Sequence, residues 1–302
     1  MSRILNLGSI NLDEVFAVPH FIRPGETMAC TSYERFLGGK GNNQSTALGR
    51  AGAAVHHAGK VGEDGGAAVA ALAASGVDVS RVGTSAKPTG RALIQVEERG
   101  QNCIILYGGA NRSITHEDVD LFLEGWGRGD SVLFQNEVSS LDYAMERAAA
   151  LGLRIFFNPS PADESIETLP LDLVSCFILN EVEAVMLGGQ DGGGADPRTM
   201  LASLRVRFPH ADLVLTLGSQ GVLFSGVDGA DLSVPAERVS AVDTTAAGDT
   251  FTGYYIAAVL RGEEPGAALA EATRAAAICV TRKGAAPSIP WRKELGAVHY
   301  KL

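Results

Sequence analysis

Residues 131–157, SVLFQNEVSSLDYAMERAAALGLRIFF, contain two short apolar runs separated by a helical pattern. The runs are residues 131–135 and 153–157, and residues 140–151 between them carry the apolar spacing of a helix. Neither run alternates apolar with polar side chains, which indicates strands that are buried on both faces. A strand, a helix and a second buried strand predict a parallel unit of an α/β fold.

The same order of elements continues toward the C-terminus. Residues 173–179 and 212–217 are further apolar runs, and helical patterns cover residues 181–187 and 197–208 between them. Buried strands separated by helices predict a central, mostly parallel sheet with helices on both of its faces. No internal repeat is visible, and we expect residues 1–302 to form a single α/β domain.

Two regions depart from this order and predict a small, discontinuous β-sheet on the α/β body. Residues 12–36 contain a Pro- and Gly-bearing segment, and residues 88–110 alternate apolar with polar side chains around a predicted turn at residues 98–101. One face of the second region carries three apolar residues: Ala92, Ile94 and Val96. We expect an antiparallel, half-exposed sheet that serves as a lid over a site or as a dimer surface, and alternation alone does not choose between the two.

Composition excludes several classes of function. A formal net charge of −10 argues against general nucleic-acid binding, which requires a basic surface. The N-terminal residues MSRILNLGSINLD form too short an apolar run for a secretion signal, and no run approaches the roughly 20 apolar residues that span a bilayer. None of the four cysteines (Cys30, Cys103, Cys176 and Cys279) forms a CxxC pair, and three of them, all but Cys30, lie in apolar runs, which predicts reduced core residues for those three. We expect a cytoplasmic protein.

The strongest chemical signal is in residues 241–255, AVDTTAAGDTFTGYY. Residues 244–248 carry no bulky side chain, and the apolar stripe after them predicts a helix that begins directly after this loop. The free N–H groups and the dipole of such a helix start bind anions, for example a phosphoryl group in transfer. Asp249 falls in the first turn, where a carboxylate can accept the proton of an attacking hydroxyl. An ordinary N-cap, worth about 1 kcal/mol, is the competing interpretation of Asp249.

A second signal is the glycine-rich loop of residues 38–44, GGKGNNQ, which opens into a helical stretch of small residues. It is not a Walker A loop, because Lys40 is followed by Gly41 rather than by Ser or Thr. The chain also lacks a G-x-G-x-x-G fingerprint after a strand, which argues against a nicotinamide-dependent oxidoreductase. A simple turn before a packed helix explains the glycines. It does not explain Lys40, Asn42 and Asn43, which suit a polyhydroxylated ligand.

Together the two loops resemble those of the ribokinase (pfkB) family of carbohydrate kinases, which have a Gly-Gly loop near the N-terminus and a DTxxAGD loop near the C-terminus. Here the two stand in that order, at residues 38–44 and 243–249. The similarity extends to residues 8–13 (GSINLD) and 280–291 (VTRKGAAPSIPW). The resemblance implies a ribokinase-like α/β fold with a β-lid and an ATP-dependent sugar kinase.

The resemblance also implies a role for each matching residue. Asp249 would be the catalytic base beside an anion hole made by Ala246, Ala247 and Gly248. The sugar would contact Asn11, Asp13, Gly39, Lys40, Asn43, Glu137 and Asp249. The nucleotide and its Mg²⁺ would contact Asn180, Glu183, Thr216, Gly218, Gly221, Gly248 and Thr273. A monovalent cation such as K⁺ would be held, mostly by backbone carbonyls, at Asp243, Thr245, Cys279, Arg282, Gly284 and Ser288.

The expected reaction is therefore transfer of the γ-phosphoryl group of ATP to a sugar hydroxyl, with the 5-hydroxyl of ribose as the first choice. Other acceptors stay open: fructose, 2-keto-3-deoxygluconate, deoxyribose or a nucleoside. A non-catalytic sugar or nucleotide sensor on the same scaffold is disfavoured, because a sensor has no need of Asp249. The apolar face at residues 92–96 favours a homodimer through the lid.

Overall fold

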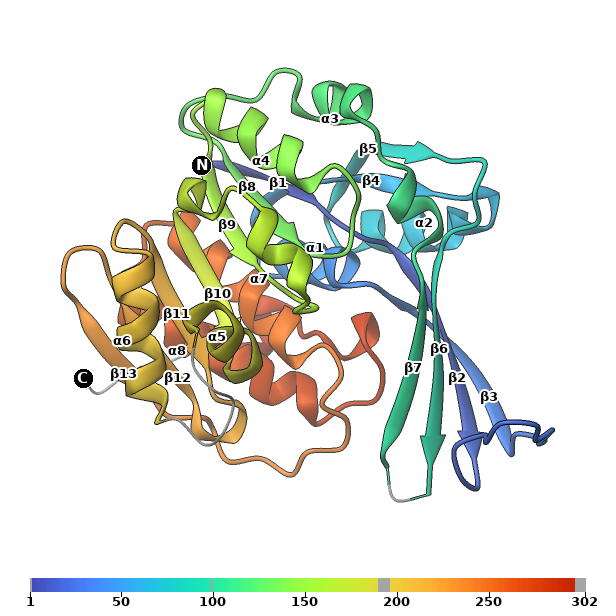
Figure 1. Ribbon diagram of the computed structural model, residues 1–302. Helices are drawn as coiled ribbons and strands as arrows, with labels where there is room; N and C mark the ends of the chain where they lie inside the picture. The colour runs from blue at the N-terminus through green and yellow to red at the C-terminus, as the bar shows by residue number, and fades with distance from the viewer. Residues whose placement is uncertain (1, 99, 190–195, 297–302) are drawn as a thin grey trace.

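The computed structural model describes residues 2–98, 100–189 and 196–296. Within these residues the body is one nine-stranded sheet in the order β13-β12-β11-β10-β9-β8-β1-β4-β5 (Figure 1). The strands from β11 to β5 pair in parallel, whereas β12 and β13 join antiparallel at one edge. The predicted α/β fold with a mostly parallel sheet is confirmed.

The strands of this sheet are short and mostly buried. In sheet order they are β13 (Asp231–Val234), β12 (Val222–Ser225), β11 (Asp212–Thr216), β10 (Cys176–Asn180), β9 (Arg154–Asn158), β8 (Ser131–Gln135), β1 (Arg3–Leu7), β4 (Ala54–Val61) and β5 (Asp78–Thr84). Successive residues of one strand point to opposite faces, so Leu5 and Ile4 of β1 belong to two different hydrophobic clusters. The sheet is therefore covered on both faces.

Four helices contribute to each cluster. One face carries α3 (His116–Leu123), α4 (Leu141–Ala150), α5 (Glu181–Gly188) and α6 (Pro197–Arg207). The other carries α1 (Lys40–Arg50), α2 (Gly66–Ala74), α7 (Ala247–Leu260) and α8 (Pro265–Val280). Short 3₁₀ turns are η1 (Glu63–Gly65), η2 (Gly109–Ser113), η3 (Glu164–Thr168), η4 (Leu171–Leu173), η5 (Gly218–Gln220), η6 (Ala286–Ser288) and η7 (Arg292–Leu295). No helix in the described part of the chain has the length and apolarity to cross a membrane.

A second, four-stranded sheet projects from the body and is called the lid below (Figure 1). Its order is β3 (Ser32–Gly38), β2 (Asn11–Val18), β6 (Gly90–Glu97) and β7 (Asn102–Tyr107). The hairpin of β6 and β7 is antiparallel, but β2 and β6 pair in parallel, so the expectation of an antiparallel sheet was wrong for this central pair. Alternation fixes which face a side chain occupies and leaves strand direction open.

The exposed apolar residues of the lid are not those that the sequence indicated. Ala92 is buried, and Ile94 and Val96 are only partly exposed. The exposed apolar side chains lie mainly on the edge strand β7: Ile104, Ile105, Leu106 and Tyr107. Cys103 of the same strand is exposed as well, which corrects its expected place in the core, because an apolar run on a thin sheet has no second layer to cover it.

Two helices that carry chemical signals lie against each other. α1 packs on α7, and Gly253 of α7 allows the close approach, because a Cβ at this position would lie 2.4 Å from the Cβ of Ala47 and 2.9 Å from the carbonyl oxygen of Gln44. Gly253 stands one helical turn after Asp249. The packing therefore brings the first turns of α1 and α7 together.

Candidate active site

The predicted site residues come from the carboxyl ends of the parallel strands, where open α/β sheets bind ligands. β10 ends at Asn180 and β11 ends at Thr216. Both residues line a cavity of about 230 Å³ together with Lys40 of α1 and Asp249 of α7. Residues from widely separated parts of the chain thus meet at one edge of the sheet.

The start of α7 is built to present backbone N–H groups. Its N-cap residue, Ala246, has the left-handed conformation (φ 61, ψ 10) and makes no side-chain capping bond. Within the described residues, the N–H groups of Ala246, Gly248 and Asp249 have no hydrogen-bond partner. The N–H of Ala247, which the sequence also assigned to the anion hole, is instead used by the carbonyl of Thr244 at 3.3 Å. A left-handed alanine costs on the order of 1–3 kcal/mol, a strain that is commonly found at functional sites. The loop therefore has the geometry of an anion hole.

Asp249 is not the N-cap of α7, and the competing interpretation of this residue was wrong. It is the third residue of the helix and only 8% exposed. Its Oδ2 accepts a hydrogen bond from Nδ2 of Asn43 at 2.9 Å, and its Oδ1 accepts one from Nε2 of Gln44 at 2.9 Å. The carboxylate is thus oriented by α1 and leaves the N–H groups of α7 free.

Among the residues predicted to bind the sugar, Glu137 is hydrogen-bonded to the start of α1. Its Oε2 accepts the backbone N–H of Lys40 at 3.0 Å and the hydroxyl of Ser9 through a short hydrogen bond. Gly39 precedes this turn with φ 88, and a Cβ there would lie 2.9 Å from the backbone nitrogen of Asn11. Glycine is needed at position 39 for both reasons.

The side chain of Asn11 is fixed by Asn111 of η2. Nδ2 of Asn111 donates to Oδ1 of Asn11 at 2.8 Å, and Oδ1 of Asn111 accepts the N–H of Ile10 at 3.0 Å. Gly90 fits beside this pair because it has no Cβ, which would lie 2.2 Å from both amide groups. The same contact closes the root of the lid, where β2 and β6 begin.

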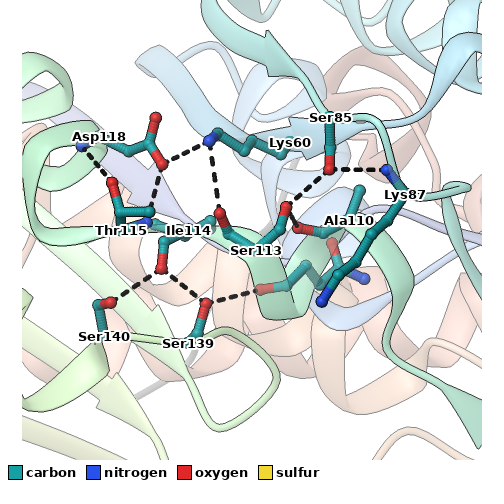
Figure 2. A network of polar contacts seen from close by, with 11 residues as sticks. Lys60, Ser85, Lys87, Ala110, Ser113, Ile114, Thr115, Asp118, Ser139 and Ser140 are labelled. Atoms are coloured by element: carbon teal, nitrogen blue, oxygen red, sulfur yellow. Dashed lines mark hydrogen bonds and ion pairs between the residues drawn. The ribbon is translucent and has the colours of Figure 1, made fainter.

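A polar network behind η2 holds that turn in place (Figure 2). Lys60 of β4 points to the carboxylate of Asp118 and to the carbonyl of Ser113 (Figure 2). The hydroxyl of Ser139 donates to the carbonyls of Ile114 and Asn111. The network connects β4, η2, α3 and the loop after β8, so Asn111 is supported from several elements.

Negative charge is concentrated around Lys40. The pKa of Asp13 is raised from its usual 3.8 to about 7 by burial and by the charges of Glu137 and Asp249. For Lys40, burial opposes the charge, but the carboxylates of Asp249, Glu137 and Glu183 outweigh it and raise the pKa of the ammonium group. Lys40 therefore carries a positive charge among carboxylates, at a place suited to anionic phosphate and to hydroxyl groups.

A larger cavity of about 470 Å³ adjoins the first one and has a mainly apolar wall. Thr216, Thr244, Ala247 and Gly248 line both cavities. Gly218, Gly221 and Thr273, which the sequence assigned to the nucleotide, line the larger one. The hydroxyl of Thr273 donates to the carbonyl of Leu269 in its own helix at 2.8 Å, so its proton is already used within the protein. The shared lining makes the two cavities continuous, as the predicted binding of a base in one and of phosphates in the other requires.

Asn180 and Glu183 form a capping box at the start of α5. Oδ1 of Asn180 accepts the N–H of Glu183 at 3.0 Å, and Oε2 of Glu183 accepts the N–H of Asn180 at 2.9 Å. Burial raises the pKa of the Glu183 carboxyl. Both side chains also line the smaller cavity, and their oxygen atoms are of the kind that bind Mg²⁺ or its water ligands. The spacing N-x-x-E therefore has a structural role as a capping box, in addition to its predicted role in binding Mg²⁺ and phosphate.

The six residues assigned to a monovalent cation lie in two segments that contact each other: the loop before α7, and the stretch from the last turn of α8 to η6. Asp243 accepts the N–H groups of Thr245 and Gly284, both at 2.9 Å, and Sγ of Cys279 lies 3.0 Å from Oγ of Ser288. Burial opposes the charge of Asp243, but these hydrogen bonds outweigh it, and the pKa of its carboxyl is lowered. A carboxylate, a hydroxyl and nearby backbone carbonyls are oxygen donors, which suit a hard cation. The guanidinium of Arg282 pairs with Glu294, so only the backbone of Arg282 is available to the predicted cation.

Sequence reasoning did not assign Gln44 or Asn111 to the site. Gln44 stands beside Asn43 in the glycine-rich segment, so the sequence placed it near the site. The sequence did not show that its side chain points to Asp249. Asn111 lies in an irregular segment and meets Asn11 across 100 residues. Neither contact has a local sequence signal.

The chain is similar to known proteins in sequence and in fold. The model of the pfkB family carbohydrate kinases matches residues 1–292. The ribokinase of Haemophilus influenzae is 36% identical over 293 residues, which cover 95% of each chain. The structure of Cryptococcus neoformans ribokinase in complex with ADP has a TM-score of 0.85 at 32% identity and covers 97% of this chain and 98% of its own. Arabidopsis thaliana ribokinase complexed with ribose and ATP also has a TM-score of 0.85, at 26% identity, and 98% of each chain is covered.

This chain therefore belongs to the pfkB family of carbohydrate kinases. As a sugar kinase it is a phosphotransferase whose acceptor is an alcohol group.

Proposed function

We propose that this protein phosphorylates ribose at its 5-hydroxyl with ATP as the donor. The observation that carries the proposal is the position of Asp249, whose buried carboxylate lies beside free backbone N–H groups at the cavity that also holds Lys40. The names of its relatives support the acceptor, since curated relatives at 33–36% identity are ribokinases.

In the proposed reaction the sugar hydroxyl oxygen attacks the γ-phosphorus of ATP, and the bond from that phosphorus to the bridging oxygen breaks. ADP leaves with the electron pair of this bond, and the hydroxyl proton passes to the carboxylate of Asp249. The N–H groups of Gly248 and Asp249 donate to the oxygens on which negative charge grows. Asn11, Asp13 and Glu137 hold the sugar from the root of the lid.

Two cations belong to the proposal. Asn180 and Glu183 would hold Mg²⁺, which supplies positive charge to the phosphates when bound. The loops at residues 243–245 and 279–288 would hold K⁺, which lies beside the anion-hole loop without touching the sugar. The enzyme would work in the cytoplasm, where ATP is available.

The proposed assembly is a homodimer formed through the lid. β7 is an edge strand with exposed apolar residues, among them Ile105 at 61% exposure. An unpaired edge with an exposed apolar patch is typical of a protein–protein interface. Light scattering on the wild type should give twice the chain mass, and the Ile105→Lys variant should give the chain mass. Val206→Lys, on the exposed side of α6, is the matched control and should remain dimeric. A monomeric wild type would contradict the dimer.

The experiment for the activity is a coupled measurement of ADP release with ribose, deoxyribose, fructose, 2-keto-3-deoxygluconate and a nucleoside, each with and without K⁺. Ribose should give the highest kcat/KM, and K⁺ should increase the rate. If ribose gave no signal while another acceptor did, the assignment of ribose would be wrong and the kinase chemistry would stand.

A further inference from the structure

Gln44 is a polar residue in a place where the protein could bury an apolar one. It lies in the second turn of α1, has no exposed surface, and makes three side-chain hydrogen bonds. Nε2 donates to Oδ1 of Asp249 at 2.9 Å and to Oδ1 of Asn158 at 2.9 Å, while Oε1 accepts from Nε2 of Gln135 at 2.8 Å. Burying an amide is costly unless its polar atoms are paired, and here both N–H groups and the oxygen of the Gln44 amide have a partner.

The direction of the Gln44 amide is forced by its neighbours. Nδ2 of Asn158 donates to the carbonyl of Ile178 at 2.8 Å, so Oδ1 of Asn158 must face Gln44 and requires a donor there. On the other side, both protons of Gln135 Nε2 are used, by Gln44 and by Oδ1 of Asn6 at 2.8 Å. A flipped Gln44 would set oxygen against oxygen at Asp249 and at Asn158, and nitrogen against nitrogen at Gln135.

The backbone around Gln44 leaves little freedom. Gly253 allows α1 and α7 to approach at the carbonyl of Gln44, and Gly8 makes room for Gln135, since a Cβ at Gly8 would lie 2.3 Å from Oε1 of Gln135. Both helices and the amide chain are therefore fixed before any ligand binds. Pre-organisation of this kind is what holds a base in reactive geometry.

The geometry points to Gln44 as the positioning residue of the base Asp249, with Gln135 and Asn158 fixing its amide so that only N–H can face the carboxylate. The inference rests on the proposed role of Asp249. Gln44 donates to one carboxylate oxygen and Asn43 donates to the other, so the carboxylate plane is defined by two successive residues of α1. An N–H donor suits the ionised carboxylate that a general base must be.

The charged and titratable groups that face Asp249 come from several elements. Lys40 lies on α1, Asp13 on β2, Glu183 on α5 and Cys279 on α8. None of them fixes the direction of the carboxylate, because its recorded hydrogen bonds in the described residues come from Asn43 and Gln44. The positioning role thus falls on the amides.

Two variants test the role of Gln44. Gln44→Glu keeps the shape but sets a carboxylate against Asp249, and Gln44→Met keeps the length without polar atoms. We expect kcat to fall by about 100-fold or more in Gln44→Glu and by about 10-fold in Gln44→Met, with KM for the sugar within about threefold. In Gln44→Glu the acid limb of the pH profile of kcat should move to higher pH, because two facing carboxylates share one proton.

The matched control is Ser45→Ala, the next residue of α1. Ser45 belongs to the same buried network, through Asn6 and His57, but does not touch Asp249. It should lower the thermal unfolding temperature without moving the acid limb. The inference is overturned if Gln44→Glu keeps kcat within about threefold of wild type, or if Ser45→Ala moves the acid limb by as much as Gln44→Glu does. A wild type without sugar-dependent ADP release would instead refute the proposed function.

Discussion

The starts of α1 and α7 look alike in sequence and differ in what they do with their N–H groups. Both follow glycine- or alanine-rich loops, both have an N-cap residue with positive φ, and neither has a side-chain cap. At α1 the N–H groups of Lys40, Gly41 and Asn42 are bonded to Glu137 and Ser9. At α7 those of Gly248 and Asp249 are free within the described residues.

This difference separates a scaffold from a reactive site. A helix start whose donors are used inside the protein fixes neighbouring side chains, while one whose donors are free can stabilise an anion. α1 orients Asp249 and, in the proposed function, would hold the sugar, while α7 would supply the anion hole. A loop of small residues before a helix does not by itself show whether the N–H groups of the helix start are bonded within the protein or free to bind an anion.

The largest expected effect is that of Asp249→Asn. The variant keeps the shape of the side chain and removes the base, so kcat should fall by about 10²–10⁴. Affinity for ATP, measured by equilibrium binding, should stay within a few-fold of wild type. A variant that retained most of its kcat would remove Asp249 from the chemistry and leave the start of α7 with binding alone.

The next effect tests the free N–H of Gly248. Gly248→Pro removes this donor in the first turn of α7, where proline is tolerated, and should lower kcat by about 10². Gly248→Ala is the matched control, since its Cβ meets open space and the N–H is kept. The alanine variant should lose much less kcat than the proline variant. Equal losses would show that backbone shape, not the donor, matters at this position.

A smaller effect concerns pH and Asp13. Since the pKa of this carboxyl is raised to about 7, the free protein holds a proton on Asp13 below that pH, and sugar hydroxyls bind the ionised form better. KM for the sugar should therefore rise by up to about tenfold for each pH unit below 7. The unliganded protein should lose stability as pH rises from near 4 to about 7. Over this range the folded state keeps a proton on Asp13 that the unfolded state has released, so raising the pH favours the unfolded state.

Asp13→Asn is the control for this titration. Its sugar affinity should be low and should change little between pH 6 and pH 8, as measured by titration calorimetry at each pH. A wild-type KM that did not change across this range would contradict the assignment of Asp13 to the sugar.

The smallest effect on catalysis is expected from the start of α1. Ser9→Ala removes the hydroxyl that joins Glu137 to the N–H of Gly41, and leaving that buried N–H unpaired should cost about 1–3 kcal/mol in the free energy of unfolding. Urea unfolding measures the loss, and kcat should fall only a few-fold. Ser233→Ala, on the exposed edge strand β13, should cost less than about 0.5 kcal/mol. A collapse of kcat in Ser9→Ala without loss of stability would give α1 a direct chemical role.

Much of the fold could be predicted because its signals are local. The continuous apolar run at residues 131–135 and the helix after it define a parallel unit without any knowledge of distant residues. The direction of β2 relative to β6 could not be predicted, since alternation in residues 88–110 sets faces only. The exposure of Cys103 could not be predicted either, because it depends on how many layers cover β7.

In the candidate site, too, features with a local sequence signal could be predicted and contacts between distant residues could not. The loop before Asp249 could be predicted from small residues and a helical stripe, whereas the bond from Gln44 to Asp249 joins residues 205 apart and depends on the contact of two helices at Gly253. The spacing from Asn180 to Glu183 matches the predicted phosphate-site motif and also forms a capping box. The spacing alone therefore could not decide between a binding role and a structural role for these two residues.

The most direct test of the difference between the helix starts of α1 and α7 is an amide NMR spectrum of the sugar-saturated protein. It is recorded before and after addition of ADP with aluminium fluoride, which imitates the transferring phosphoryl group. The amide protons of Gly248 and Asp249 should shift strongly downfield as they gain an acceptor. Those of Gly41 and Asn42, already bonded to Ser9, should change little. Large shifts at Gly41 and Asn42 with none at Gly248 and Asp249 would contradict it.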